Sequence, residues 1–105
     1  MIDEILLSKA VALIVEEMKP ERIILFGSQA RGTADKRSDV DLLIISRFKG
    51  KRRERIAELY GALIDSGFAQ DIILMTPEEY EREREIPGTI ARPASREGKV
   101  LYEYS

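Results

Sequence analysis

Two aspartates, Asp39 and Asp41, lie two positions apart at the start of a short apolar run, 40–45. Because side chains at i and i+2 of a strand point to the same face, about 6.5 to 7 Å apart, we expect the two carboxylates to converge. Carboxylates on one face of an apolar strand repel each other and resist burial unless a positive charge lies between them. The pair therefore predicts a divalent cation, and oxygen donors favour magnesium or manganese.

A third aspartate, Asp71, precedes the next apolar run, 72–75. Sequential strands often lie side by side, so Asp71 can join the sheet edge that carries Asp39 and Asp41. Three carboxylates could hold two metal ions about 3.5 to 4 Å apart, an arrangement that stabilises both the attacking and the leaving oxygens in a displacement at phosphorus. A single acidic residue at a strand edge is also commonplace, so the prediction depends on the order of the strands.

Gly27 and Ser28 follow the first apolar run and supply groups that bind phosphate. A glycine lets backbone N–H groups approach a phosphate, and a short helical turn over 28–31 would present its N-terminus to an anion. The Ser28 hydroxyl adds a donor for the terminal phosphates, although it could also cap the turn. Arg31 is either a further phosphate ligand or a structural partner of one of the aspartates.

These residues form one pattern: Gly27-Ser28, ten residues (29–38), then Asp39-Val40-Asp41, with Asp71 on a later strand. In this pattern the chain resembles the nucleotidyltransferase superfamily that includes DNA polymerase beta, specifically its minimal nucleotidyltransferase (MNT) branch. The resemblance implies that the three aspartates are catalytic and hold two Mg²⁺ ions, with Asp71 beside the acceptor hydroxyl. It also implies that Gly27 and Ser28 grip the triphosphate, so that attack falls on the α-phosphate and pyrophosphate leaves.

Proteins of the MNT branch are typically paired with a small helical HEPN protein, a toxin to which the MNT antitoxin can attach AMP. The resemblance therefore implies a protein adenylyltransferase that uses ATP and modifies a hydroxyl of such a partner. Two alternatives stay open. One is a docking module without catalysis, in which a nucleotide is a structural ligand; the other is nucleotidyl transfer to a small molecule, which would require an oligomer or a partner to build the acceptor pocket.

Composition narrows the class of protein. With 105 residues and 44% hydrophobic residues we expect one globular domain over 1–105. The chain has no cysteine and no histidine, which leaves carboxylates as the main candidates for chemistry. A net charge of −2 argues against a nucleic-acid partner, and no apolar run is long enough for a membrane span, so we expect a cytoplasmic protein.

A basic run over 49–55 and the order of the predicted elements complete the interpretation. The basic run contains Lys49, Lys51, Arg52, Arg53 and Arg55, and is either a solvated helix entry or a docking patch for RNA, triphosphate or an acidic partner. The apolar periodicity and the positions of Gly and Pro predict an α/β or α+β fold with a mixed sheet and helices packed against it. The elements are a helix over 3–18, strands over 22–26 and 40–45, a helix over 51–66, a strand over 72–75, a helix opening at Thr76, a broken helix in 86–97 and a strand over 100–104.

The two longest predicted helices each have an apolar face. In the helix over 3–18 this face consists of Ile5, Leu6, Ala10, Leu13 and Ile14. In the helix over 51–66 it consists of Ile56, Leu59, Tyr60, Leu63 and Ile64, and Gly67 stands where a C-terminal cap is expected.

Overall fold

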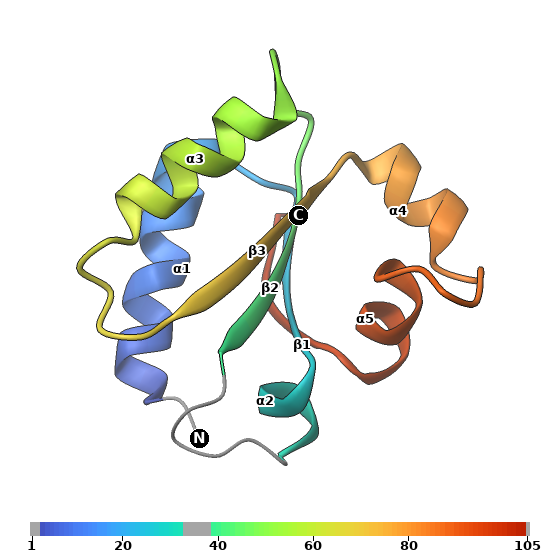
Figure 1. Cartoon of the computed structure of the whole chain (residues 1–105), viewed down its shortest axis with the longest axis horizontal. Helices are drawn as coiled ribbons and strands as arrows, with labels where there is room; N and C mark the ends of the chain where they lie inside the picture. The colour runs from blue at the N-terminus through green and yellow to red at the C-terminus, as the bar shows by residue number, and fades with distance from the viewer. Residues whose placement is uncertain (1–2, 33–38, 105) are drawn as a thin grey trace.

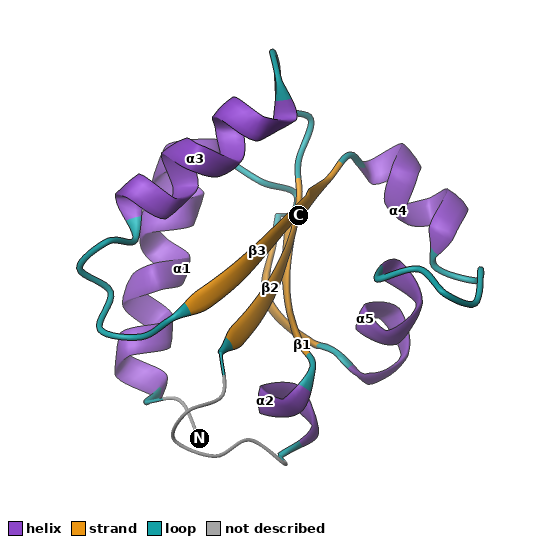
Figure 2. Ribbon diagram, in the orientation of Figure 1, coloured by secondary structure: helices purple, strands orange, loops and turns teal. Residues whose placement is uncertain are grey.

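The computed structural model describes residues 3–32 and 39–104. This part of the chain contains five helices and four strands, and Figure 2 shows the strands at the centre with the helices around them. The elements are α1 (Glu4–Met18), β1 (Arg22–Phe26), α2 (Ser28–Arg31), β2 (Val40–Ile45), α3 (Arg52–Ala62), β3 (Gln70–Met75), α4 (Pro77–Glu83), α5 (Ala91–Glu97) and β4 (Lys99–Glu103). The predicted α/β fold is confirmed, and the segment 86–97 contains the short helix α5.

The four strands form one mixed sheet in the order β3-β2-β1-β4. β1 pairs with β2 and with β4 in the antiparallel sense, whereas β2 and β3 are parallel and are connected through α3. The second and third strands are therefore neighbours, as the prediction for Asp71 required. Because β2 and β3 start at the same end of the sheet, the residues that open them lie side by side.

Helices cover both faces of the sheet, so the central strands are buried on two sides. Figure 1 shows α1 and α3 on one face and α4 and α5 on the other, with α2 at one end of the sheet. On the α1 side the core includes Ile23, Leu42 and Ile44, and on the α5 side it includes Ile24 and Leu43. Alternate strand residues thus enter opposite cores, which explains why these strands are apolar almost throughout. None of the helices in the described part of the chain combines the length and the apolar character that crossing a membrane demands.

Helix α1 starts where it was expected but presents a different face to the core. Asp3 caps it by accepting a hydrogen bond from the Ile5 amide at 2.7 Å. Its buried side chains are Leu7, Ala10 and Ile14. Ile5 is 68% exposed and Leu13 is 40% exposed, so not all the apolar residues whose spacing predicted the helix face the core. The helix has apolar residues on more than one face, and only packing against the sheet decides which face is buried.

Helix α3 ends earlier than predicted, at Ala62, and Leu63 is its C-cap. Gly67 therefore does not cap it, although its φ of +90° shows that the chain turns there. Leu59 and Leu63 are buried as predicted, whereas Ile64 is 80% exposed. The early end lets the chain turn back so that the Ser66 hydroxyl donates to the Phe68 carbonyl at 3.1 Å, just before β3 begins.

Helix α4 opens as its sequence predicts. The Glu79 amide donates to the Thr76 hydroxyl at 3.1 Å, and the Thr76 amide donates to the Glu79 carboxylate at 2.8 Å. This reciprocal capping box gives partners to two backbone amides that the helix end would otherwise leave unpaired, and Pro77 stands in the first turn.

Candidate active site

The start of the parallel strand pair brings two of the predicted aspartates together. Asp41 is the second residue of β2 and its register partner on β3 is Asp71. On the other side of β2, Asp41 lies opposite Phe26, the last residue of β1. Asp41 is half-buried and Asp71 is exposed. The two carboxyl groups are close enough to act on each other, so one edge of the sheet carries a pair of neighbouring acidic groups.

Gly27 lies directly after β1 and against the side chain of Asp41. Its φ of 73° and ψ of −154° are accessible only to glycine. A Cβ atom at this position would overlap the Oδ2 atom of Asp41 and would lie 3.1 Å from its Cγ. The backbone of Gly27 therefore occupies space that any side chain would take from the Asp41 carboxylate.

The four-residue helix α2 follows at once, as the sequence predicted. Its first turn is closed by a hydrogen bond of 3.1 Å from the Arg31 amide to the Gly27 carbonyl. Ser28, half-buried, is its first residue, and α2 packs against both β1 and β2. Asp39, which is exposed, lies just before β2. The structure thus brings Gly27, Ser28, Asp39, Asp41 and Asp71 to one end of the sheet.

The charges at this end act on Asp41. Burial is the largest cause that raises the pKa of the Asp41 carboxyl above its usual value of 3.8. The negative charges of Asp71 and Asp39 and the hydrogen bond with Asp71 raise this pKa further, whereas the charge of Arg31 lowers it. In the described part of the chain Asp41 has no ion pair of its own. Arg37, another arginine close to Asp41 in the sequence, lies outside the described residues.

Arg31 pairs with a glutamate that no sequence motif had singled out. Its Nη1 atom lies 3.6 Å from Oε2 of Glu97, at the end of α5. Both side chains are about half exposed, so the pair contributes at most about 1 kcal/mol to stability. In the described part of the chain the ion-pair partner of Arg31 is therefore Glu97, and the charge of Arg31 also acts on Asp41. Only the packing of α5 against β1 reveals this, because the two residues are far apart in sequence.

The acidic residues at this edge offer carboxylate oxygens, the donors of a magnesium site. Within residues 3–32 and 39–104 no group of three His, Cys, Asp or Glu side chains is placed to hold a metal ion as a set. Asp41 and Asp71, however, are register partners, and the negative charge of Asp71 helps to raise the pKa of the Asp41 carboxyl. A divalent cation would relieve this repulsion, and carboxylate oxygens are the ligands magnesium prefers. These two residues fit a magnesium ion, and Asp39 lies exposed just before β2 at the same end of the sheet.

The basic run 49–55 contributes to structure. Arg52 forms an ion pair of 2.6 Å with Glu79 of α4 and stacks over Phe48, and Arg55 pairs with Glu58 at 2.7 Å. These contacts account for two of its five basic residues.

The sequence also matches a known family. The model of the nucleotidyltransferase domain matches residues 8–96, which is most of the chain and includes Gly27, Ser28, Asp39, Asp41 and Asp71. The chain belongs to the nucleotidyltransferase domain family. Its transferase class follows from this membership, and members of the family generally use a nucleoside triphosphate and a divalent metal.

One curated relative and two solved structures are similar to this nucleotidyltransferase domain. The "Putative protein adenylyltransferase MJ1305" of Methanocaldococcus jannaschii is 68% identical over 31 residues, which are 30% of this chain and 21% of the relative. A chain of the crystal structure of a toxin-antitoxin with AMP-PNP is 22% identical, with a TM-score of 0.59, over 93% of this chain and 74% of the other.

A chain of the complex between a tri-AMPylated Shewanella oneidensis HEPN toxin and its MNT antitoxin is 20% identical, with a TM-score of 0.55. That match covers 96% of this chain and 72% of the other. At these identities the solved structures establish the fold, which is that of nucleotidyltransferases. The curated match spans only about a fifth of the relative's length.

Proposed function

We propose that this chain transfers AMP from ATP to a hydroxyl of a partner protein of the HEPN toxin type and acts as its antitoxin. The observation that carries the proposal is the junction of Gly27, Ser28, Asp41 and Asp71 at one sheet edge. Supporting it are the family of the chain, the name of its adenylyltransferase relative, and the AMPylated toxin in the similar complex from Shewanella.

Each residue of the site has a role in this reaction. Gly27 and Ser28 hold the triphosphate, because the glycine backbone leaves room for an anion and the Ser28 hydroxyl can donate to it. Asp41 and Asp71, with Asp39 beside them, would hold Mg²⁺, which when bound would neutralise charge on the triphosphate. Arg31 adds a positive charge beside Asp41 and can contact a phosphate.

The transfer itself balances without an additional reactant. The acceptor hydroxyl oxygen forms a bond to the α-phosphorus, the bond to the bridging oxygen of the β-phosphate breaks, and pyrophosphate leaves. The hydroxyl proton passes to a carboxylate, and Asp71 is the candidate because it lies exposed at the edge while Asp41 is half-buried.

The first experiment is calorimetric titration of ATP with and without magnesium. We expect binding that requires magnesium, and we expect the double variant Asp39→Asn, Asp41→Asn to lose it. Asp65→Asn is the matched control, since it neutralises an exposed aspartate outside the site. If the double variant bound ATP as tightly as the parent protein, or if binding did not depend on magnesium, the metal-triphosphate site would be rejected and a docking module favoured.

The acceptor is tested separately with ATP labelled in the α-phosphate. Incubation with a HEPN toxin should place label on a hydroxyl side chain of the toxin, and intact-mass measurement should show whole AMP units. Label found on an aminoglycoside or another small alcohol, with none on the protein, would change the substrate class but not the reaction. Magnesium-dependent ATP binding without transfer to any acceptor would contradict the enzymatic proposal.

A further inference from the structure

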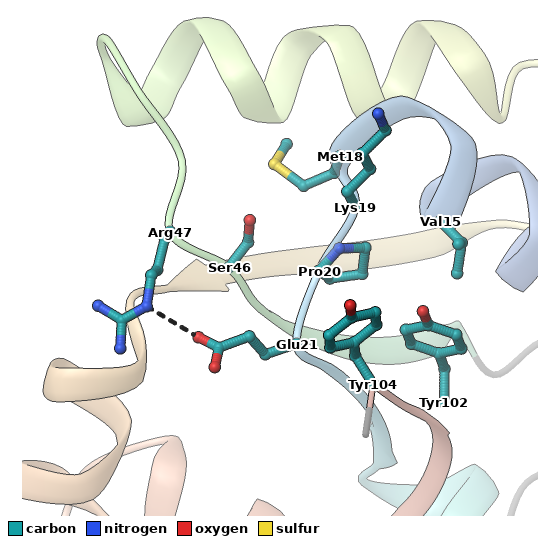
Figure 3. A pocket seen from close by; sticks show the side chains of 9 residues that line it. All are labelled: Val15, Met18, Lys19, Pro20, Glu21, Ser46, Arg47, Tyr102 and Tyr104. Atoms are coloured by element: carbon teal, nitrogen blue, oxygen red, sulfur yellow. Dashed lines mark ion pairs between the residues drawn. The ribbon is translucent and has the colours of Figure 1, made fainter.

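A pocket of about 600 Å³ lies at the end of the sheet opposite Asp41 and Asp71 (Figure 3). Asp41 and Asp71 open β2 and β3, whereas Ser46 and Arg47, which line the pocket, follow the last residue of β2. The end of α1, the segment leading into β1 and the end of β4 complete the wall. Its volume falls within the range of roughly 300 to 1,000 Å³ that is usual for sites of small molecules.

The walls of this pocket combine apolar and aromatic surfaces. Val15, Met18 and Pro20 form its apolar side. Tyr102 and Tyr104, two positions apart at the end of β4, lie on the same side of the strand and both line it (Figure 3). Tyr104 is 73% exposed, although its amide is held by a 2.9 Å hydrogen bond to the Glu21 carbonyl. A large aromatic side chain fixed at its backbone but left exposed offers stacking surface and a hydroxyl to a ligand.

Ser46 places a polar group without a partner in the pocket wall. The residue is only 2% exposed. Its amide donates to the Met75 carbonyl at 2.9 Å, but its hydroxyl forms no hydrogen bond within residues 3–32 and 39–104. The Ser46 oxygen is not sealed from solvent, so the hydroxyl is open to the pocket and free to donate there. A ligand acceptor in the pocket would satisfy it.

Lys19 supplies an unpaired positive charge at the same pocket. It is the C-cap of α1, with φ 49° and ψ 58°, and no other residue except glycine has a positive φ in the described ranges. A left-handed conformation costs a lysine roughly 1 to 2 kcal/mol, and glycine is usual at this position of a helix end. The chain therefore has a lysine at a position where a glycine would be less strained.

The second cation of the wall is already neutralised. Arg47 pairs with Glu21 at 3.4 Å, as the dashed line in Figure 3 marks, and with Glu78 at 2.7 Å. Lys19 has no ion pair in the described part of the chain. Among the described residues the lining therefore has one positive charge without an ion pair, and it also carries the hydroxyl groups of Ser46, Tyr102 and Tyr104.

We propose that this pocket binds a small monocarboxylate with an apolar body. The carboxylate would accept from Lys19 and Ser46, and the apolar body would lie between Val15, Met18 and the tyrosine rings. A monoanion fits better than a phosphate dianion, because the C-terminal end of α1 carries partial negative charge and Glu21 stands in the wall. This binding is independent of ATP and of the aspartate site.

The test titrates the protein with hydrocinnamate and, separately, with its uncharged counterpart hydrocinnamyl alcohol. Two-dimensional NMR of the backbone amides detects binding. We expect shifts at Lys19, Ser46 and Tyr104 but not at Gly27 or Asp71, and affinity about five- to tenfold higher for the acid. Absence of shifts at these amides, or equal affinity for acid and alcohol, would overturn the proposal.

Two variants sharpen this test. Lys19→Gly removes the amine and also relieves the left-handed strain, so the variant should fold at least as well as the parent protein. It should lose the preference for the acid while it keeps weak affinity for the alcohol. Lys9→Gln, which neutralises an exposed lysine of the same helix outside the pocket, should bind like the parent protein. Unchanged preference in Lys19→Gly would reject the assignment of the carboxylate site.

Discussion

The two ends of the same sheet treat charge in opposite ways. At the end that carries Asp41 and Asp71, like charges crowd together and raise the pKa of Asp41. At the other end Arg47 bridges Glu21 and Glu78, so opposite charges are paired. At this second end the pKa of Glu78 is lowered, because its carboxylate accepts hydrogen bonds from its own backbone and from Arg47. The pKa shifts at the two ends are therefore opposite in direction. Crowded like charges destabilise the folded protein unless a cation joins them, whereas paired opposite charges do not destabilise it.

Asp71→Asn should have the largest effect, because it removes the proposed proton acceptor without adding bulk. We expect nucleotidyl transfer to fall by at least about 100-fold, the usual size of general base catalysis. Magnesium-dependent ATP binding should fall much less, since Asp39 and Asp41 remain. Rates of label transfer and calorimetric titration together measure the two effects. A rate within threefold of the Asp65→Asn control would remove Asp71 from the proposed chemistry.

Gly27→Ala should break the close approach between the β1–α2 turn and Asp41. Its Cβ would overlap the Asp41 carboxylate, and its positive φ adds strain, so we expect a loss of about 2 to 3 kcal/mol of stability. Gly32→Ala is the matched control, because its φ is also positive at 75° but no atom lies within 4 Å of its added Cβ. The control should lose only about 1 kcal/mol. Urea unfolding curves compare them, and equal losses would show that contact with Asp41 is unimportant.

Thr76→Ala tests the end of the sheet where charges are paired and helix α4 begins. The change removes the hydroxyl that accepts from the Glu79 amide and should cost about 1 kcal/mol. Ser8→Ala, at an exposed position of α1, should change the free energy of unfolding by less than about 0.5 kcal/mol. Thermal unfolding followed by circular dichroism measures both variants. Similar melting temperatures for the two would show that the capping box contributes little.

Asp41→Asn should change the pH dependence of stability, with the smallest effect. The folded-state pKa of Asp41 is raised above 3.8, so its contribution to stability is fully present below that pH and is lost as pH rises through the folded pKa. Asn carries no charge, so the variant should be more stable than the parent at pH 7, by at most about 1 kcal/mol. At pH 3 the difference should vanish.

Magnesium separates electrostatics from packing in this experiment. Addition of magnesium should raise the melting temperature of the parent protein, because a bound cation relieves the repulsion around Asp41. The Asp41→Asn variant should respond less. A parent protein that is the more stable of the two at pH 7 without magnesium would contradict the repulsion inferred at this edge.

Local sequence predicted the strands and the helix starts well. β1 and β2 have the predicted bounds, and Asp3 and Thr76 cap α1 and α4 through their own side chains. These features depend on hydrogen bonds within a few residues and on runs of apolar residues. The prediction that the second and third strands are neighbours was also confirmed. It could be made from sequence because consecutive strands often lie side by side.

Packing decided what local sequence could not. Ile5 and Ile64 belong to helical apolar patterns but are exposed, because each helix can bury only the face that meets the sheet. The end of α3 depends on where the chain must turn to enter β3, and Gly67 alone did not indicate this. The pairing of Arg31 with Glu97 depends on α5 reaching the same end of the sheet as α2.

The sequence by itself determined the elements of this protein and the residue types of its site. The spacing of Gly27, Ser28, Asp39 and Asp41 is a property of one short stretch, so it can be recognised without a fold. Tertiary structure alone decided that Asp71 stands opposite Asp41, that Gly27 touches the carboxylate, and that Lys19, Ser46 and Tyr104 line one pocket. The physical reason is range: capping and strand formation depend on neighbours in the chain, whereas a site depends on segments that meet only when the sheet has formed.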